Sequence, residues 1–344
     1  MVKETPISVS LIYLYFGGFD LIILCRNECP YPPSPLVRKY IVEYSDHVNR
    51  YEIPGLEDKL VELLAKYVGV DKEYVHMISG SEAFFVSLPW AMVKHGYRFI
   101  YSSPTFAPAV DDLRVWGIRV VDVPLTSDFR VDVDSVLKHS GHDSILYIVR
   151  PNNPTGNDPI TCEEIEDLVD SFKVVIIDEA YYEFSGLTCV DLVKSYDNIV
   201  VLRTFSKAFC LAGARLAYVI TSPETYKEFF GIRRKYDIPV LSLLAGLGAI
   251  EDLGYMRKVV EDIIRVKKWV VEELRKRENT VVIDTLTNFI LVGKKGYDSH
   301  SLFIALKERG VLVKELDGRL RDYVRVSIGK FDEMKFFLKA LDEI

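Results

Sequence analysis

The stretch NIVVLRTFSKAF, residues 198–209, changes character halfway along its length. Its first five residues are an apolar run of the length of a buried strand, and Thr204, Ser206 and Lys207 follow soon after. A lysine beside a protein core is costly unless it is paired or used chemically. The groups around this strand end therefore decide whether Lys207 is a solvated surface residue or a reactive amine.

Further apolar runs precede and follow this strand, and helical patterns lie between several of them. A capping box at Thr161 and Glu164 opens EIEDLVDSF, and Ser79–Gly80–Ser81 opens a second helical pattern that Pro89 is expected to kink. Strands alternating with helices predict an α/β fold, with a large domain whose mostly parallel sheet is covered by helices. The other predicted strands are RFIYSS (98–103), RVVDVPL (119–125), SILYIV (144–149), KVVIID (173–178) and LAYVI (216–220).

The pattern changes after about residue 240. Residues 243–277 read as long helical sequence with one or two breaks, and shorter strands and helices follow, which predicts a smaller α+β domain. We expect three segments: an N-terminal arm and strand (1–30) associated with the small domain, the large domain (31–240), and the small domain with its linking helix (241–344). The later strands are TVVID (280–284), NFILVG (288–293), GVLVKEL (310–316) and YVRVSIG (323–329), and the later helices are SLFIALKERG (301–310) and FDEMKFFLKALDEI (331–344).

Composition excludes some classes of function. The net charge is -7, and Lys and Arg are spread along the chain, so a nucleic-acid partner is not expected. The apolar stretch SLIYLYFGGFDLIILC (10–25) is too short to span a membrane and has no cleavage site of small residues. We interpret it as a packed arm and strand, and expect a cytoplasmic protein without a membrane partner.

The five cysteines match no zinc-binding spacing, so no metal site is expected. Cys25 and Cys29 are close enough in sequence to touch, but a reduced cytosolic chain is the preferred interpretation. The remaining cysteines are Cys162, Cys189 and Cys210.

Polar side chains follow three predicted strands at the point where each strand ends. In open α/β sheets, ligands bind beyond the carboxyl ends of the strands. Gly80 and Ser81 precede a predicted helix whose free backbone N–H groups favour an anion such as phosphate, and Arg215 could add a guanidinium. The strand-end groups are Asn152 and Asn153, then Asp178 and Tyr181, then Thr204, Ser206 and Lys207.

Each of these features also has a simpler explanation. The PNNPTG segment (151–156) can be a turn, and the SGS segment (79–81) can be a plain helix cap. Asp178 can cap a helix or pair with a cation, and Lys207 can extend to solvent. The joint placement of these groups at strand ends of one sheet is what favours a functional site.

The inventory at this edge fits one cofactor. A buried amine forms Schiff bases with carbonyls, an acid keeps a pyridine nitrogen protonated, and a helix N-terminus holds a phosphate. Amide and phenol groups can bind a ring hydroxyl. These are the contacts that proteins make with pyridoxal 5′-phosphate, which is therefore the predicted cofactor.

At these residues the chain resembles the fold-type I pyridoxal-phosphate-dependent aminotransferases of class I/II. Within them it is most similar to the histidinol-phosphate aminotransferases, and the resemblance implies an aspartate aminotransferase-like fold. The phrases that carry it run in family order over nearly the whole chain: NECPYPPSP (27–35), NRY (49–51), SGSEA (79–83), SPTF (103–106), VPLTSDFRVDV (123–133), PNNPTG (151–156), DEAYYEF (178–184), RTFSKAFCLAGAR (203–215), TNFILV (287–292) and VRVSIG (324–329).

The resemblance implies a role for each matching residue. Lys207 matches the lysine that forms the Schiff base and moves the proton, and Asp178 matches the acid on the pyridine nitrogen. Asn153 and Tyr181 match the groups bonded to the ring hydroxyl, and Phe106 matches the aromatic residue stacked on the ring. The resemblance also implies a set of phosphate-binding residues, in which Ser81 and Glu82 act through their backbone N–H groups. The set is Gly80, Ser81, Glu82, Thr204, Ser206 and Arg215.

The resemblance also implies partners. Tyr51 matches a tyrosine that reaches the phosphate in the neighbouring subunit, so a homodimer is expected. Arg325 matches the arginine that binds the acidic group of the substrate. The family usually has a second arginine where this chain has Lys314, which loses the bidentate fork and leaves the substrate open.

The expected reaction is a ping-pong transamination between a small-molecule amino donor and a 2-oxo acid, with L-histidinol phosphate and 2-oxoglutarate as the first choice. Alternatives are an aspartate or aromatic amino acid aminotransferase and a threonine-phosphate decarboxylase, which FGG (16–18) faintly resembles. A non-catalytic pyridoxal-phosphate-binding homologue is disfavoured by the complete set of Lys207, Asp178 and Asn153. A nicotinamide-dependent enzyme is an even weaker alternative, because the GxG-like phrase at 245–251 follows no predicted strand.

Overall fold

The computed structural model of the protein describes residues 21–106, 108–230 and 236–344. The chain forms two compact units, and the division falls inside helix α11 (Leu253–Arg275). One unit holds Glu28–Arg265 and Asp284–Asn288, and the other holds the described residues up to Asn27 with Val266–Ile283 and Phe289–Ile344. Most of the predicted N-terminal arm lies outside the described residues.

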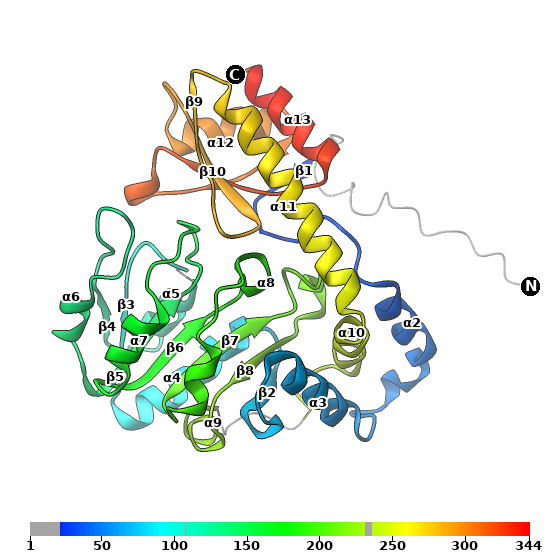
Figure 1. The fold of residues 1–344 in the computed structure, drawn as a ribbon, viewed down its shortest axis with the longest axis vertical. Coiled ribbons are helices and arrows are strands. Elements are labelled where there is room, and N and C mark those ends of the chain that lie inside the picture. Colours follow the sequence, from blue (N-terminus) through cyan, green and yellow to red (C-terminus); the bar gives the residue numbers. More distant parts are fainter. Residues whose placement is uncertain (1–20, 107, 231–235) are drawn as a thin grey trace, which may run out of the picture. The chain divides into compact units, whose positions relative to one another are not determined.

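The larger unit is built on one sheet, whose described strands have the order β2-β8-β7-β6-β5-β3-β4 (Figure 1). The neighbours from β7 to β4 are parallel, whereas β8 is antiparallel to both β7 and β2. The prediction of a mostly parallel sheet is confirmed; β2, which includes His76, was not among the predicted strands. The strands are β2 (Val75–Ile78), β3 (Arg98–Tyr101), β4 (Val120–Asp122), β5 (Gly141–Val149), β6 (Phe172–Asp178), β7 (Ile199–Thr204) and β8 (Ala217–Ile220).

Helices of the same unit pack around this sheet (Figure 1). The predicted capping box is present, because the Thr161 hydroxyl accepts from the Glu164 N–H and the Glu164 carboxylate accepts from the Thr161 N–H. Helix α4 continues through Pro89 as one element. The helices are α2 (Pro35–Glu43), α3 (Leu56–Val68), α4 (Ser81–His95), α5 (Pro108–Val115), α6 (Val133–Leu137), α7 (Cys162–Val169), α8 (Tyr182–Ser185), α9 (Pro223–Phe230) and α10 (Val240–Ile250), with 3₁₀ turns η1 (Ser45–Asn49), η2 (Lys72–Tyr74), η3 (Val190–Lys194) and η4 (Ala212–Ala214).

The core of this unit lies between α4 and one face of the sheet. Phe84, Phe85 and Leu88 of α4 are buried in one cluster with Tyr147 of β5 and Leu202 of β7. Because side chains alternate along a strand, residues in step with these on β5, β6 and β7 also face α4. This alternation sets which face each side chain at the strand ends occupies.

The smaller unit has a sheet of the order β12-β13-β10-β9, antiparallel between neighbours, and a parallel pair β1–β11. The predicted strand GVLVKEL is divided at the buried Val313, because its halves pair with different neighbours. The elements are β1 (Ile22–Ile23), β9 (Thr280–Ile283), β10 (Phe289–Lys294), β11 (Val311–Leu312), β12 (Lys314–Glu315) and β13 (Val324–Ser327), α12 (Ser299–Glu308) and α13 (Phe331–Asp342), and the 3₁₀ turn η5 (Gly318–Leu320).

The expectation of a reduced chain is wrong for this structure. Disulfides join Cys29 to Cys210 and Cys162 to Cys189, with Cα–Cα distances of 5.0 and 5.4 Å, and Cys25 is in neither bridge. The paired cysteines are 181 and 27 residues apart in sequence, so only the fold brings them together.

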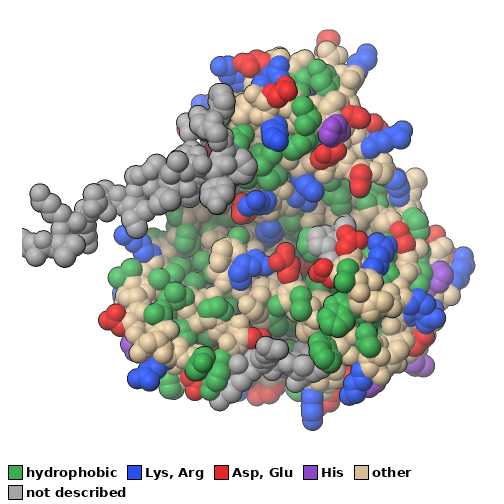
Figure 2. All heavy atoms as spheres, turned by 180° about the vertical axis from the view of Figure 1, so that it is seen from behind, with side chains coloured by type: hydrophobic (Ala, Val, Ile, Leu, Met, Phe, Trp, Pro, Cys, Tyr) green, Lys and Arg blue, Asp and Glu red, His purple; other side chains and the backbone are tan. Residues whose placement is uncertain are grey.

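The surface matches the dispersed charge of the sequence. On the face shown in Figure 2, basic and acidic side chains are interspersed. Within the described part of the chain, no helix combines the length and the apolar character needed to cross a bilayer.

Candidate active site

The predicted site residues of the larger unit converge because of strand direction. Strands β5, β6 and β7 run parallel, so their carboxyl ends meet at one edge. Strand β2 is antiparallel to β8, which is antiparallel to β7, so the carboxyl end of β2 reaches the same edge. Ile78 and Thr204 both pair with Ala217 there. The segments that follow β2, β5, β6 and β7 therefore start at one edge of the sheet, and the segment that precedes β8 ends there.

Asp178 is the last residue of β6 and is 5% exposed. Its side chain shares the α4 face of the sheet with Tyr147, whose hydroxyl donates to Asp178 Oδ2 at 3.0 Å. The Ala180 N–H donates to the other oxygen, Oδ1, at 3.1 Å. Burial raises the pKa of Asp178 to about 6, although these hydrogen bonds and nearby Lys207 oppose the shift. Two hydrogen bonds thus orient a buried carboxyl group at the end of β6.

A buried ion pair supports the opposite face of the same strand ends. Arg203 of β7 and Glu179, which follows β6, are 2% and 0% exposed, and Arg203 Nη2 lies 2.8 Å from Glu179 Oε2. The Tyr182 ring lies against the guanidinium, 3.7 Å from its carbon. Because Glu179 is next to Asp178 and Arg203 is next to Thr204, the ion pair fixes the spacing of two predicted site residues. A charged residue inside the buried stretch IVVLRT was a signal for it that the sequence reasoning missed.

The residues predicted to bind a phosphate lie at the start of α4 and in the segments beside it. Gly80 has φ 82°, and a Cβ at this position would lie 3.0 Å from Arg215 Nη2, so glycine permits the close approach of the guanidinium. The predicted hydroxyls are adjacent, since Thr204 Oγ1 donates to Ser206 Oγ at 3.0 Å. Arg215 Nη2 donates to the Glu82 carboxylate at 2.8 Å. The side chain of Glu82 is thus a contact of Arg215, beyond the backbone role expected for this residue.

The segments after β3 and β5 are tied together. Asn152 Oδ1 accepts from Thr105 at 2.8 Å, and its Nδ2 donates to the Pro104 carbonyl at 2.9 Å. This fixes Phe106, which packs against the core cluster, beside the segment of Asn153. Asn153 is 8% exposed. The linkage of these two segments through Asn152 was not predicted.

Lys207 lies in the loop between β7 and η4, and it is close enough to Asp178 to favour ionisation of that carboxyl group. Tyr181, 3% exposed, follows β6 and also lies near the Tyr147 hydroxyl. The Lys207 carbonyl accepts from the N–H of Cys210, at 3.2 Å. The bridge from Cys210 to Cys29 therefore anchors the loop that carries the lysine.

Lys314 and Arg325 lie in the smaller unit, and Tyr51 precedes α3 in the larger one. Tyr51 is 81% exposed and stacks on Tyr236, with ring centroids 5.2 Å apart. Arg325 of β13 and Lys314 of β12 are register partners in the sheet of the smaller unit, so their side chains share one face. Arg325 Nη2 donates to the Cys25 carbonyl at 2.9 Å.

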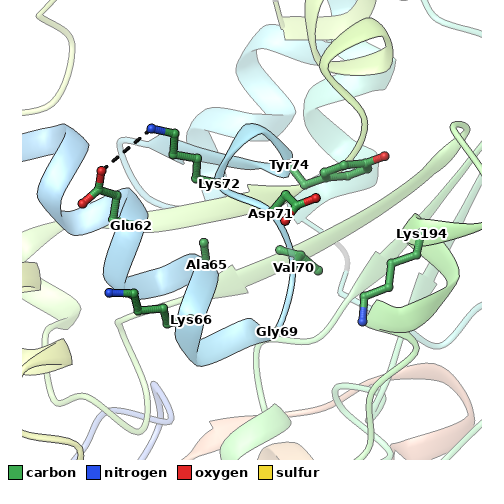
Figure 3. Close-up of a pocket in the computed structure, with 9 residues that line it drawn as sticks. All are labelled: Glu62, Ala65, Lys66, Gly69, Val70, Asp71, Lys72, Tyr74 and Lys194. Carbon is green, nitrogen blue, oxygen red and sulfur yellow. Dashed lines mark ion pairs between the residues drawn. The ribbon is translucent and has the colours of Figure 1, made fainter.

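A surface hollow of about 670 Å³ lies elsewhere, between the end of α3 and η3 (Figure 3). Two of its lysines have acidic partners, because Lys72 lies 3.8 Å from Glu62 and Lys194 lies 2.7 Å from Asp191. None of the predicted site residues lines this hollow. It is therefore not the candidate active site.

The chain matches the family described as aminotransferase class I and II over residues 20–341, and it belongs to this family. It is 33% identical to the histidinol-phosphate aminotransferase of Pyrococcus furiosus, over 96% of this chain and 94% of that protein. A histidinol-phosphate aminotransferase from Sinorhizobium meliloti, solved in complex with pyridoxal-5′-phosphate, has a TM-score of 0.85 at 23% identity, covering 100% of this chain and 97% of that one. The L-threonine-O-3-phosphate decarboxylase from Porphyromonas gingivalis has a TM-score of 0.79 at 20% identity, covering 94% and 99%. The two solved structures show the fold alone.

The predictions of fold class, enzyme class and pyridoxal 5′-phosphate as cofactor are confirmed by this family membership. The residues present fit that cofactor. Asp178 is a buried acid whose two hydrogen-bond donors are neutral, and Gly80 leaves room for Arg215 beside the start of α4. Both features suit a ligand with a cationic ring at one end and a phosphate at the other.

Proposed function

We propose that this aminotransferase transfers the amino group of L-histidinol phosphate to 2-oxoglutarate. The supporting observation is the 33% identity, over nearly the whole chain, to a relative named histidinol-phosphate aminotransferase. The pair of cations on one face of β12 and β13, Lys314 and Arg325, suits a substrate that carries an acidic group. The lysine acts as a point charge where an arginine would bind two oxygens.

The bound cofactor supplies an aldehyde and an electron-withdrawing pyridinium ring. In our proposal, the Asp178 carboxylate holds the proton on the ring nitrogen, and Asn153 and Tyr181 orient the ring through its hydroxyl group. Phe106 covers one face of the ring. The Lys207 Nζ would take the proton from the amine-bearing carbon of the donor and would return it to the former aldehyde carbon of the cofactor. Water would supply the carbonyl oxygen of the departing donor, and the amino group would stay in the site until the 2-oxo acid takes it and releases its own carbonyl oxygen as water.

The phosphate group is proposed to bind at the start of α4. The backbone N–H groups of Ser81 and Glu82, in the first turn of α4 after Gly80, would donate to this anion. The Thr204 and Ser206 hydroxyls donate to the same group, and the Arg215 guanidinium neutralises part of its charge. Glu82 competes for that guanidinium, so binding of the phosphate exchanges one anion for another on Arg215.

We further propose that the enzyme is a homodimer in which Tyr51 completes the neighbouring site. The 81% exposure of this tyrosine supports the idea, because a large aromatic side chain is available to a second chain. Equilibrium sedimentation tests it, and a chain that remains monomeric at micromolar concentration while fully active would contradict it. A cytoplasmic location is also proposed; disulfides occur there mainly in proteins of hyperthermophiles, and cell fractionation tests it.

The test of the reaction is the visible spectrum of the protein loaded with pyridoxal phosphate, before and after L-histidinol phosphate is added. Loss of the yellow absorption, and its return when 2-oxoglutarate follows, is the expected result. If the spectrum responds to aspartate or aromatic amino acids instead, that amino acid is the donor in place of L-histidinol phosphate. Release of carbon dioxide from phosphothreonine, without an oxo acid, would favour the decarboxylase. If no donor changes the spectrum, the protein binds the cofactor but does not carry out this reaction.

A further inference from the structure

Tyr147 occupies a position on β5 that points toward the end of β6. The register pairs Tyr147 with Ile176 and Val149 with Asp178, so Tyr147 is the diagonal neighbour of Asp178 on the α4 face of the sheet. A diagonal neighbour is within reach of a long aromatic side chain. The Tyr147 hydroxyl therefore reaches the Asp178 carboxylate from the side of the core.

The ring of Tyr147 is held in one place. It is 2% exposed and makes edge contacts with Phe85 of α4, at 5.3 Å between centroids, and a tilted contact with Phe99 of β3, at 5.5 Å. A buried phenol needs a hydrogen-bond partner, and its partner here is Asp178 Oδ2, at 3.0 Å. The packing thus determines where the hydroxyl lies before any ligand binds.

The direction of this hydrogen bond is determined by its surroundings. Burial and the neighbouring carboxylate raise the pKa of Tyr147 well above that of an exposed tyrosine, so the phenol keeps its proton and donates. Asp178 accepts at Oδ2 from this hydroxyl and at Oδ1 from the Ala180 N–H. Two donors, one on each oxygen, fix the plane of the carboxylate and favour its ionised form.

We propose that Tyr147 is a positioning residue for the cofactor, whose hydroxyl holds the Asp178 carboxylate in the orientation that receives the pyridine nitrogen. This inference rests on the proposed role of Asp178. Tyr147 does not touch the cofactor in this account and acts only through the acid. Its loss should therefore weaken only those ligands that carry a ring nitrogen, whereas the loss of a merely structural side chain would weaken all ligands of the same shape.

The test compares two ligands with the cofactor-free protein by equilibrium titration. The first is pyridoxal 5′-phosphate, and the second is its 1-deaza analogue, in which a C–H group replaces the ring nitrogen. The variant is Tyr147→Phe, which keeps the ring and its packing. The matched control is Tyr101→Phe, because Tyr101 is the register partner of Tyr147 on β3 and its hydroxyl accepts from Arg114 at 3.1 Å. Thermal unfolding checks that each variant is folded.

Tyr147→Phe is expected to bind pyridoxal phosphate roughly ten- to a hundredfold more weakly, as for the loss of a hydrogen bond to a charged group, with the deaza analogue changed by less than about threefold. Tyr101→Phe is expected to leave both affinities within that smaller range. Equal weakening of both ligands by Tyr147→Phe, or no weakening of either, would overturn the proposal. If the wild-type protein binds neither ligand, the proposed cofactor site itself fails, which is a separate outcome.

Discussion

Reduction of the bridge between Cys162 and Cys189 gives the most direct test of how the larger unit is stabilised. The bridge closes a loop with a sequence separation of 27 residues and joins the start of α7 to the segment before η3. Both sulfur atoms also lie within reach of the buried Arg150 guanidinium, whose Nη1 is 3.4 Å from Cys162 and 3.3 Å from Cys189.

The magnitude follows from the length of the loop. In the chain-entropy account, a closed loop of this length raises the free energy of unfolding by about 3.5 kcal/mol. For a chain of this size, that corresponds to about 5 °C in melting temperature. The bridge between Cys29 and Cys210, with a separation of 181 residues, is worth about 5 kcal/mol in the same account.

The assay is thermal unfolding of the cofactor-free protein with and without a phosphine reductant, in the wild type and in a Cys162→Ala, Cys189→Ala double variant. Peptide mapping without reduction first verifies the two pairs. The reductant should destabilise the double variant less than the wild type, because one bridge is already absent. Mapping that finds Cys162 and Cys189 as thiols, or a melting temperature unaffected by complete reduction, would refute the reasoning.

Three further outcomes are expected. The pKa of Asp178, raised to about 6 by burial, means that the folded cofactor-free protein binds a proton that the unfolded chain releases near pH 4, so stability should fall by about 3 kcal/mol as the pH rises from about 4 to above 6. Urea unfolding across this range measures the fall, and Asp178→Asn should remove the part due to Asp178, whereas the part due to Glu183, whose pKa burial raises to about 7, should remain; a variant with the same pH dependence as the wild type would contradict the assignment. Gly156→Ala should lower the free energy of unfolding by about 2–4 kcal/mol, because Gly156 has φ 74° and a Cβ would collide with Thr285. The control Gly186→Ala, at φ 72° in open space, should lower it by about 1 kcal/mol. Equal urea midpoints for the two variants would argue against close packing at Gly156. Arg203→Met leaves its acidic partner buried beside a neutral side chain and should lower the free energy of unfolding by about 3–5 kcal/mol, and retention of wild-type stability would show that the ion pair is dispensable.

Local sequence is enough to predict the strands of the larger sheet other than β2, and the polar groups that follow several of them. The apolar runs that became β3, β5, β6, β7 and β8 were recognisable because strands buried on both faces need continuous apolar sequence. The residues that follow them were recognisable because polar groups directly after buried strands collect at one edge of a parallel sheet. Family phrases added the roles, which local physics alone left open.

The support of these groups depends on contacts between segments that are distant in the sequence. Tyr147 stands in an apolar run, and its hydrogen bond to Asp178 depends on the register between β5 and β6, which sequence spacing does not specify. The division of GVLVKEL between two strand pairings likewise depends on which neighbours each half meets. The cysteine pairs are the clearest case, because Cys29 and Cys210 are separated by 181 residues and meet only when the chain has folded. Local sequence determines the elements, whereas contacts between distant segments depend on the packing of the whole unit.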